Sequence, residues 1–231
     1  MITAAISSIY VIVPAYNEAR VIVATLAPLV AAGYKVIVVD DCSSDETWTL
    51  LDQLPVIRIR HHMNLGQGAA LETGMEYARR CGAGIVVHFD ADGQHDSEQI
   101  SAIVAPIVEG QADVVFGSRF LLRSDVLRIP RAKRVVLRVG RIVSGLSTGV
   151  WLTDAHNGFR ALSGKAVASV RLRENGYAHA TEILEQVRRA GLRYVEIPTT
   201  VRYTDYSRAK GQPISSAVDI TLDLIIRKLF S

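Results

Sequence analysis

The first half of the chain alternates short apolar runs, rich in valine and isoleucine, with longer helical patterns. The runs are nearly continuous rather than alternately apolar and polar, which is typical of strands covered on both faces. They occupy residues 9–13, 35–39, 56–60, 84–89 and 113–116. The helical patterns occupy residues 19–32, 45–54, 67–81 and 97–109. This alternation predicts an α/β fold in which helices flank a mostly parallel central sheet.

After about residue 119 the alternation stops. Here the pattern predicts helices at residues 131–147, 180–190 and 213–230, and strands at 156–162 and 194–202. The last strand contains Pro198, which indicates an edge strand or a bulge. No repeat or linker interrupts the chain, so its 231 residues are expected to form a single domain.

Composition excludes several classes of protein. With 49% hydrophobic and 21% charged residues, the chain is neither disordered nor fibrous. Its two cysteines, Cys42 and Cys81, are too few for a disulfide scaffold and fit a reducing cytoplasm. No apolar run approaches the roughly 20 residues that a transmembrane helix needs, and the first residues lack the positive charge of a signal peptide. A cytoplasmic location is therefore expected.

Positive charge is concentrated in one segment. Residues 119–141 contain eight lysine or arginine side chains, opposed only by Asp125. Subtracting these from the 26 basic and 23 acidic residues of the whole chain leaves 18 basic and 22 acidic residues, a net charge of −4. The segment is either a solvated helix face or a surface for an anionic partner, such as an acceptor phosphate or a membrane. No nucleic acid partner is expected.

Polar, acidic residues follow three of the predicted strands. They lie at residues 14–18, 40–47 and 90–95. Ligands of open α/β sheets bind outside the carboxyl ends of the strands, so these segments are the candidate site. For Asp45 and Glu46, capping of the following helix is an equally good interpretation, with Ser43 and Ser44 as further candidate caps. Ser97 with Glu98 is the expected start of the helix at 97–109.

Asp90 and Asp92 are the most informative pair. Two carboxylates that emerge together from a buried strand repel each other unless a cation lies between them. Mg²⁺ or Mn²⁺ takes such oxygen ligands and leaves positions for substrate phosphates, and Gln94 could supply a further oxygen. The alternative is an acidic surface turn with Gly93 at a positive φ angle.

Residues 64–70, with the sequence NLGQGAA, precede a helix but do not form a dinucleotide fingerprint. The GxGxxG pattern fails because position 71 is leucine, and the segment follows the third predicted strand rather than the first. A dehydrogenase is therefore disfavoured. The helix start at Gly66 and Gly68 can still accept a phosphate or pack closely against the sheet.

Together these motifs resemble the family-2 glycosyltransferases of the GT-A fold, and within them the branch that makes polyprenyl-phosphate or dolichyl-phosphate mannose or glucose. The matching stretches are VIVPAYNEA, VVDDCSSDET, NLGQGAALETGMEYA, FDADGQHD, VVFGSRF, DAHNGFRALS and EIPTTVRYTDYSRAKGQ, spanning residues 11–212. The resemblance implies a nucleotide-binding half at residues 1–118, an acceptor-side half at 119–212 and a C-terminal helix at 213–231.

The resemblance also implies roles for individual residues. The nucleotide-binding set comprises Pro14, Ala15, Tyr16, Glu18, Val39, Asp41, Gly68, Asp90 and Ala91. The metal-binding DxD element is Asp90 and Asp92, with Gln94 assisting. Arg119, Arg134, Arg160 and Lys210 would face the diphosphate or the acceptor, and Asp154, Asp92 and Arg119 are the catalytic candidates. The donor would be a UDP- or GDP-linked sugar, transferred with inversion.

The acceptor decides whether a base is needed. A hydroxyl must lose a proton to a positioned group, for which Asp154 is the first candidate and His156 the second, whereas a lipid phosphate is already anionic. The branch has a serine before its Gly-Phe-Arg motif, but this chain has Asn157, and its loop at residues 206–212 also differs. Both departures lie on the acceptor side. The predicted acceptor is a polyprenyl phosphate, and a sugar hydroxyl of a polysaccharide or glycolipid is the alternative.

Two other classes of protein, a nucleotidyltransferase and a non-catalytic nucleotide-binding protein, fit the sequence less well than a glycosyltransferase does. A nucleotidyltransferase usually carries a glycine-rich basic loop after its first strand, where this chain has Pro14 to Glu18. A non-catalytic nucleotide-binding protein would have no need of the intact pair of Asp90 and Asp92. The helix at residues 213–230 has an apolar stripe suited to core packing, to subunit contact or to a membrane surface or membrane protein. An enzyme peripheral to the cytoplasmic membrane face is thus one expectation, and the oligomeric state stays open.

Overall fold

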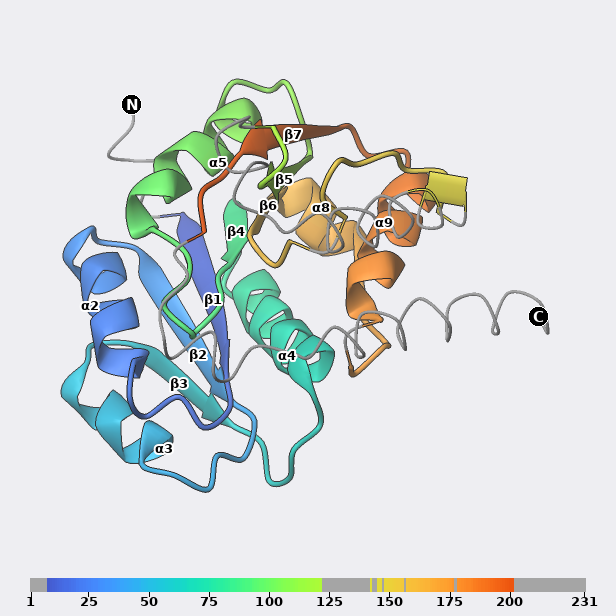
Figure 1. Cartoon of the computed structure of the whole chain (residues 1–231). Coiled ribbons are helices and arrows are strands. Elements are labelled where there is room, and N and C mark those ends of the chain that lie inside the picture. Colours follow the sequence, from blue (N-terminus) through green and yellow to red (C-terminus); the bar gives the residue numbers. More distant parts are fainter. Residues whose placement is uncertain are drawn as a thin grey trace.

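A computed structural model describes residues 8–121, 142, 145–146, 148–155, 157–176 and 178–201 (Figure 1). This part of the chain contains one seven-stranded sheet in the order β3-β2-β1-β4-β6-β5-β7. The strands are β1 (Ile9–Ala15), β2 (Lys35–Asp40), β3 (Ile57–Arg60), β4 (Ile85–His88), β5 (Val114–Ser118), β6 (Arg160–Ser163) and β7 (Tyr194–Pro198). Only β6 runs antiparallel to its neighbours, β4 and β5. The predicted mostly parallel sheet is confirmed.

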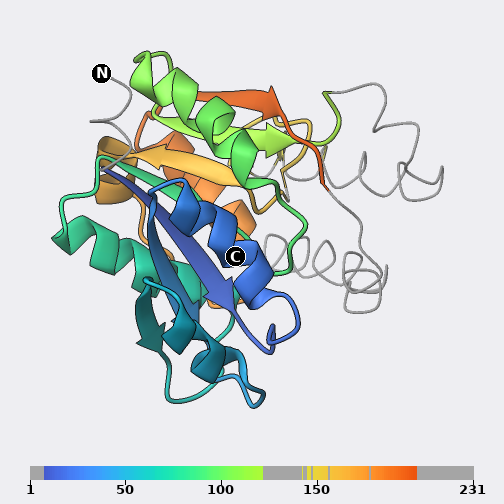
Figure 2. The same cartoon turned by 90° about the vertical axis from the view of Figure 1, so that its left-hand side faces the viewer.

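Helices cover both faces of this sheet (Figures 1 and 2). On one face pack α2 (Ile22–Ala31), α3 (Thr47–Leu50) and α5 (Ile100–Val108), together with the 3₁₀ turns Leu51–Gln53 and Ser97–Gln99. On the other face pack α4 (Gln67–Arg80), α8 (Gly164–Ser169) and α9 (His179–Arg189). The resulting three layers explain why β1, β2, β4 and β5 are apolar on both sides. The outer strand β3 differs from the prediction, because its partly buried isoleucines alternate with exposed arginines.

Strand β1 contributes side chains to the hydrophobic cores on both faces of the sheet. Val11 and Val13 are fully buried against the α2 and α5 side, whereas Ile12 is fully buried against the α4 side. Full burial of such a side chain contributes about 1.5–3 kcal/mol. A methyl group at Gly74 would lie 3.2 Å from Cγ1 of Ile12, so this glycine allows α4 to approach the strand closely.

Several element boundaries differ from the sequence prediction. The helix expected from residue 19 begins at Ile22, because the backbone of Glu18 first turns and accepts the N–H groups of Val21 and Ile22. The cap expected at Ser97 is instead Asp96, whose carboxylate accepts the N–H of Glu98 at 3.1 Å.

Short elements account for the other differences. The helix expected at 45–54 is a four-residue α3 followed by a 3₁₀ turn. The strand expected at 156–162 spans Arg160–Ser163. It leads directly into α8, which the sequence pattern did not predict and which Ser163 caps by accepting the N–H of Ala166. β7 is an edge strand that ends at Pro198, as the proline indicated.

Some predictions fall on residues that the structure does not describe. These are the helix at 213–230, most of the basic helix at 131–147, Arg134, His156 and the 206–212 loop with Lys210. In the described part of the chain, no helix combines the length and apolar character that crossing a membrane requires.

The start of β5 is held by an ionic cluster around Asp113. Its carboxylate accepts the N–H of Arg193 at 2.9 Å and contacts the Nε of Arg193 and the Nζ of Lys165, both at 3.3 Å. The hydrogen bonds from Arg193, aided by Lys165, lower the pKa of Asp113 to about 2. Asp113 thereby joins β5 to the segment that enters β7 and to α8.

Replacing Asp113 by asparagine is expected to reduce the free energy of unfolding by about 1–2 kcal/mol at pH 7, after allowance for the solvent exposure of both basic partners. Because the folded-state pKa is depressed, the stabilisation is full above the unfolded value of 3.8 and is lost as the pH falls toward about 2. Urea unfolding of both proteins from pH 7 to pH 3 measures the difference. A deficit that stays constant over this range would contradict the ionic explanation.

Candidate active site

The candidate site lies at the carboxyl edge of the sheet. The loops after β1, β2, β4 and β5 all emerge there, and the antiparallel strand β6 begins there. This topology brings residues 14–18, 40–47, 90–95, 118–120, 153–155 and 157–160 to one end of the molecule. All of them except Thr153 come from motifs that the sequence analysis quotes.

The loops after β1 and β2 are tied together. Oδ1 of Asn17 accepts the N–H groups of Ser44 at 2.8 Å and Asp45 at 3.3 Å, and the N–H of Asn17 donates to Oγ of Ser43 at 2.9 Å. Asn17 and Cys42 have φ angles of 55° and 64°, which non-glycine residues rarely adopt. These hydrogen bonds hold the loops after β1 and β2 together as one structural unit. Ser43 acts as a link between loops rather than as the expected helix cap.

Within this unit the predicted nucleotide-binding residues differ in exposure. Tyr16 is 44% exposed and Pro14 is partly exposed, whereas Ala15, Val39 and Glu18 are buried. Tyr16 is thus the most accessible side chain for a base or ribose. The roles of the five residues remain predictions.

Asp41 is already engaged inside the protein. Its Oδ1 accepts the N–H of Leu65 at 2.9 Å and lies 2.7 Å from Nδ1 of His61, and its Oδ2 accepts the N–H of Gly66 at 2.7 Å. His61 in turn contacts Oγ1 of Thr73 on α4 at 2.9 Å. The carboxylate of Asp41 therefore anchors the loop that leads into α4.

Gly68 is closely packed in the structure. Its N–H donates to the carbonyl oxygen of Asn175 at 2.7 Å, and a methyl group at this position would lie 3.0 Å from Cβ of His179. Of the two interpretations of this helix start, the geometry favours close packing, although the contact is with the segment before α9 rather than with the sheet. A phosphate contact at Gly68 has no support from this position.

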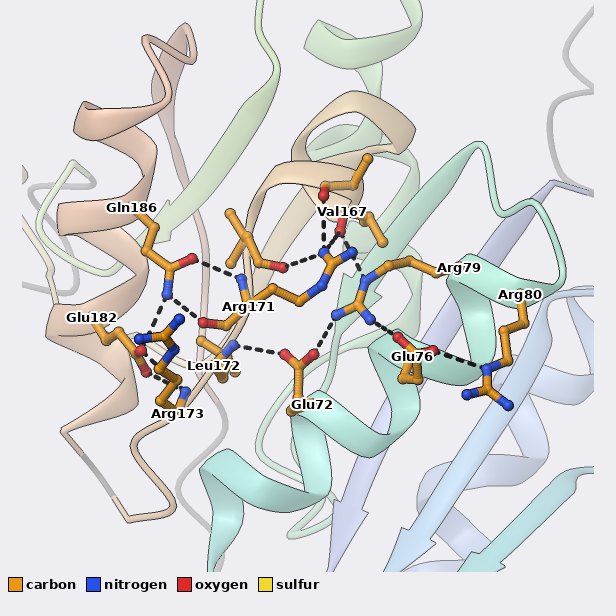
Figure 3. A network of polar contacts seen from close by, with 12 residues as sticks. Glu72, Glu76, Arg79, Arg80, Val167, Arg171, Leu172, Arg173, Glu182 and Gln186 are labelled. Carbon is orange, nitrogen blue, oxygen red and sulfur yellow. Dashed lines mark hydrogen bonds and ion pairs between the residues drawn. The ribbon is translucent and has the colours of Figure 1, made fainter.

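A polar network holds that segment in place (Figure 3). Glu72 of α4 accepts the N–H of Leu172 at 2.7 Å, and Glu182 of α9 accepts the N–H groups of Arg173 and Glu174 at 2.9–3.0 Å. The segment between α8 and α9 is therefore held by hydrogen bonds to α4 and to α9. Its next residues, 175–176, cover the start of α4 and so connect this network to the site.

Asp90 and Asp92 follow β4 at the centre of the edge. Oδ1 of Asp90 accepts a hydrogen bond from Nε2 of Gln67, and Oδ2 lies 3.0 Å from Nε2 of His95. Oδ1 of Asp92 accepts the N–H of Gln94 at 3.0 Å. Ala91, between the two aspartates, is buried, and its carbonyl oxygen accepts the hydroxyl of Thr25 at 3.2 Å.

The environments of the two carboxylates separate their pKa values. Burial acts to raise the pKa of Asp90, but the hydrogen bond and charge of His95, followed by the charge of Arg160, outweigh it and lower the pKa. For Asp92, burial and the negative charge of Asp90 raise the pKa to about 6. At neutral pH both are ionised, and their repulsion is the feature that a divalent cation would relieve.

These residues fit a hard divalent cation. Two carboxylates and the side-chain oxygen of Gln94 are oxygen donors of the kind that Mg²⁺ and Mn²⁺ prefer. The described residues contain no group of three or more His, Cys, Asp or Glu side chains suited to a metal. A cation here would accordingly take its remaining ligands from substrate phosphates and water, which is the usual arrangement for Mg²⁺.

Arg119 and Asp154 form a bidentate pair on the acceptor side. Nε and Nη2 of Arg119 lie 2.7 and 2.8 Å from the two oxygens of Asp154, and the N–H of Arg119 adds a third hydrogen bond at 3.1 Å. Asp154 is buried, and Arg119 is partly exposed. As it stands, the carboxylate of Asp154 orients an arginine rather than presenting an open base.

Sequence reasoning missed Glu196, which supports this pair. Its carboxylate on β7 accepts the N–H of Thr153 at 2.8 Å, the hydroxyl of Thr153 at 2.8 Å and the N–H of Asp154 at 3.1 Å. Oγ of Ser118 lies 2.6 Å from the same hydroxyl. In the sequence, Glu196 begins the stretch EIPTTVRYTDYSRAKGQ, but nothing in that stretch indicates that its partners are Thr153 and Asp154.

Arg160 is buried beneath the site. Its side chain is 1% exposed, and Nη2 donates to the carbonyl oxygen of Asn157 at 2.9 Å. Burial lowers its pKa to about 10, against the opposing effect of Asp90 and Asp154, so it remains charged at neutral pH. The neighbouring His88 is also buried, and burial and then Arg160 lower its pKa strongly. Arg160 thus balances the charges of Asp90 and Asp154 from the interior. Its Nε and Nη1 are buried and have no hydrogen-bond partner among the described residues, and its contact with a diphosphate or acceptor stays a prediction.

Comparisons with known proteins agree with this arrangement. A sequence profile described as glycosyl transferase family 2 matches residues 10–171. The UDP-N-acetylglucosamine–dolichyl-phosphate N-acetylglucosaminyltransferase of Methanococcus voltae is 33% identical, with 96% of each chain covered. The undecaprenyl-phosphate mannosyltransferase of Micrococcus luteus is 29% identical over 90% of this chain and 89% of its own length.

A solved structure shares the fold. Glucosyl-3-phosphoglycerate synthase from Mycobacterium tuberculosis, in complex with Mn²⁺, UDP and phosphoglyceric acid, superposes with a TM-score of 0.71 at 20% identity. The match covers 96% of this chain and 78% of that one. At this identity the likeness shows the GT-A fold alone. The profile match and the named relatives show more: the chain belongs to glycosyl transferase family 2, is a glycosyltransferase, and resembles relatives that are named as polyprenyl-phosphate sugar transferases.

Proposed function

We propose that the protein transfers a hexose, with inversion, from a UDP- or GDP-linked donor to a polyprenyl-phosphate lipid in the presence of Mg²⁺ or Mn²⁺. The named relatives act on dolichyl phosphate and undecaprenyl phosphate, and a GT-A neighbour was crystallised with Mn²⁺ and UDP. A peripheral position on the cytoplasmic membrane face would bring such an enzyme to its lipid acceptor. The concentrated positive charge of residues 119–141 is consistent with that position.

The observation that carries this proposal is the pair of Asp90 and Asp92 at the carboxyl edge. The chain holds Asp90 ionised through neighbouring donors, while Asp92 has a pKa raised to about 6 by burial and by Asp90. A divalent cation between them would offset the negative charge that grows on the diphosphate as the sugar leaves. Tyr16 is 44% exposed at the same edge, and in this proposal its ring contacts the nucleoside.

The pairing of Arg119 with Asp154 favours a phosphate acceptor. An acceptor phosphate is already anionic and needs an oriented cation rather than a base. Nε and Nη2 of Arg119 occupy both oxygens of Asp154 in a bidentate arrangement, so this carboxylate is paired with a cation rather than open as a base. A sugar hydroxyl, the alternative acceptor, would require Asp154 to give up this pair before it could accept a proton.

Thermal unfolding with nucleotides tests the donor half of this proposal. UDP, GDP, dTDP and CDP are each added with and without Mn²⁺ at 100 times the dissociation constant, which adds about 2.7 kcal/mol to the free energy of unfolding. For a chain of this size we expect one nucleotide to raise the melting temperature by roughly 5–10 °C, and only with Mn²⁺. No shift with any nucleotide would contradict the donor site, and a shift independent of Mn²⁺ would contradict the metal.

A further inference from the structure

The carboxylate of Asp90 is held on both of its oxygens. The amide nitrogen Nε2 of Gln67 donates to Oδ1 at 3.0 Å, and Nε2 of His95 lies 3.0 Å from Oδ2. The two donors come from different elements, one from the first residue of α4 and the other from the loop after β4. Both residues lie in stretches that the sequence analysis quoted, NLGQGAA and FDADGQHD, but neither was assigned a role there.

The His95 ring is fixed by aromatic packing. Its side chain is 5% exposed, it stacks on Phe159 with centroids 5.1 Å apart at 24°, and it meets the edge of Phe89 at 5.7 Å and 63°. Nδ1 is buried and has no hydrogen-bond partner in the described structure. Nε2 is therefore the ring nitrogen through which His95 donates a hydrogen bond to Asp90, since an ionised carboxylate can only accept one.

The backbone around Gln67 is fixed by hydrogen bonds, as the His95 ring is fixed by packing. The backbone on either side of it is bound: the N–H of Gly66 donates to Asp41, and the N–H of Gly68 donates to Asn175. An ionised carboxylate only accepts hydrogen bonds, so the amide nitrogen of Gln67 must face Asp90. Each carboxylate oxygen can accept two hydrogen bonds or ligand contacts, and each receives one here from these two side chains.

We propose that Gln67 and His95 are positioning residues for the metal site. By occupying one lone pair on each oxygen, they fix the orientation of Asp90 and leave the second lone pair of each oxygen directed toward a cation. Asp92 has a backbone hydrogen bond from Gln94 and no such pair of side-chain donors among the described residues, so Asp90 is the preorganised member of the pair. This inference rests on the proposed metal-dependent function and adds two residues to it.

Three variants separate the hydrogen bond from the packing. His95→Phe keeps an aromatic ring between Phe89 and Phe159 but removes the donor. His95→Gln keeps an N–H donor near the position of Nε2 but removes the ring. Gln67→Met keeps the length and helix preference of the side chain without its donor, and tests the same idea from the other element. Melting temperatures without metal confirm that each variant is folded.

The readout is Mn²⁺ affinity rather than turnover. Free Mn²⁺ is measured by electron paramagnetic resonance during titration of each protein with saturating UDP. Loss of a residue that orients a metal ligand typically weakens binding 10- to 100-fold, which we expect for His95→Phe and Gln67→Met. His95→Gln is expected to stay within about threefold of the wild type, because the donor is retained.

The outcomes distinguish this inference from the proposed function. If the wild type binds Mn²⁺ and the two donor-less variants bind it equally well, the positioning role is wrong and the metal site stands. If His95→Gln loses as much affinity as His95→Phe, ring packing rather than the hydrogen bond is responsible, and the proposal is again wrong for His95. If the wild type with UDP binds no Mn²⁺, the metal site itself is refuted, and the positioning role with it.

Discussion

Replacing Asp92 by asparagine is expected to reduce sugar transfer by roughly 100- to 1,000-fold, the usual cost of losing one group that stabilises transition-state charge. Asparagine can still accept the N–H of Gln94 through its side-chain oxygen, so the turn is preserved. It cannot supply the negative charge that a cation needs. Steady-state kinetics with the donor identified by thermal unfolding measure the effect.

The same change is expected to stabilise the metal-free protein. Burial and the charge of Asp90 raise the pKa of Asp92 from 3.8 to about 6, so ionisation of Asp92 costs stability that is fully lost above pH 6 and retained below 3.8. At pH 7 the variant should gain about 1–3 kcal/mol, and the gain should shrink below pH 6 and disappear as the pH falls below 3.8. Loss of activity with increased stability is the signature of a functional charge pair.

Asp96→Asn is the matched control. Asp96 lies in the same loop, and its carboxylate accepts the N–H of Glu98, which asparagine can replace as a helix cap. Its activity and Mn²⁺ affinity should equal those of the wild type. If Asp92→Asn retained full activity, or if both variants lost activity equally, Asp92 would have no specific role in transfer.

Gly158→Ala is expected to give the second large effect, a loss of transfer of roughly 100-fold accompanied by weaker Mn²⁺ binding. A methyl group at this position would lie 2.9 Å from Oδ1 and 3.0 Å from Cγ of Asp90, well inside contact distance. Asp90 would have to rotate away from Gln67 and His95. Transfer kinetics and Mn²⁺ titration of the variant measure the two consequences.

Gly176→Ala provides the comparison for this substitution. A methyl group there would meet no atom of the described residues within 4 Å, so the same chemical change is made without a clash against them. The control should match the wild type in both assays. Equal behaviour of the two alanine variants would show that the contact between Gly158 and Asp90 does not govern the site.

The sequence was sufficient to predict the sheet and the position of the site. Continuous apolar runs identified β1, β2, β4 and β5 because these strands are buried on both faces. The loops with Asp90 and Asp92 could be assigned to one edge because parallel strands end together. The spacing of these two aspartates is local, and so it was visible without any knowledge of the fold.

Contacts between distant segments could not be predicted in this way. Asp154 was expected as a base, and Arg160 as a phosphate ligand, because both are charged residues in a functional motif. Both roles stay predictions, but the fold adds partners that the local pattern does not reveal: Arg119 pairs with Asp154, and strand pairing places Arg160 in the interior beside His88. The support from Glu196 depends on β7 lying beside β5, which no local pattern reveals.

The most direct test of sugar transfer to a lipid phosphate is the assay itself. UDP- and GDP-linked radiolabelled hexoses are incubated with a short polyprenyl phosphate, with and without Mn²⁺ or Mg²⁺, and the lipid is extracted and counted. We expect labelled lipid from one donor class, formed only with the cation and only when the acceptor carries its phosphate. Absence of labelled lipid with every donor, or equal labelling of the unphosphorylated polyprenol, would contradict the proposed reaction.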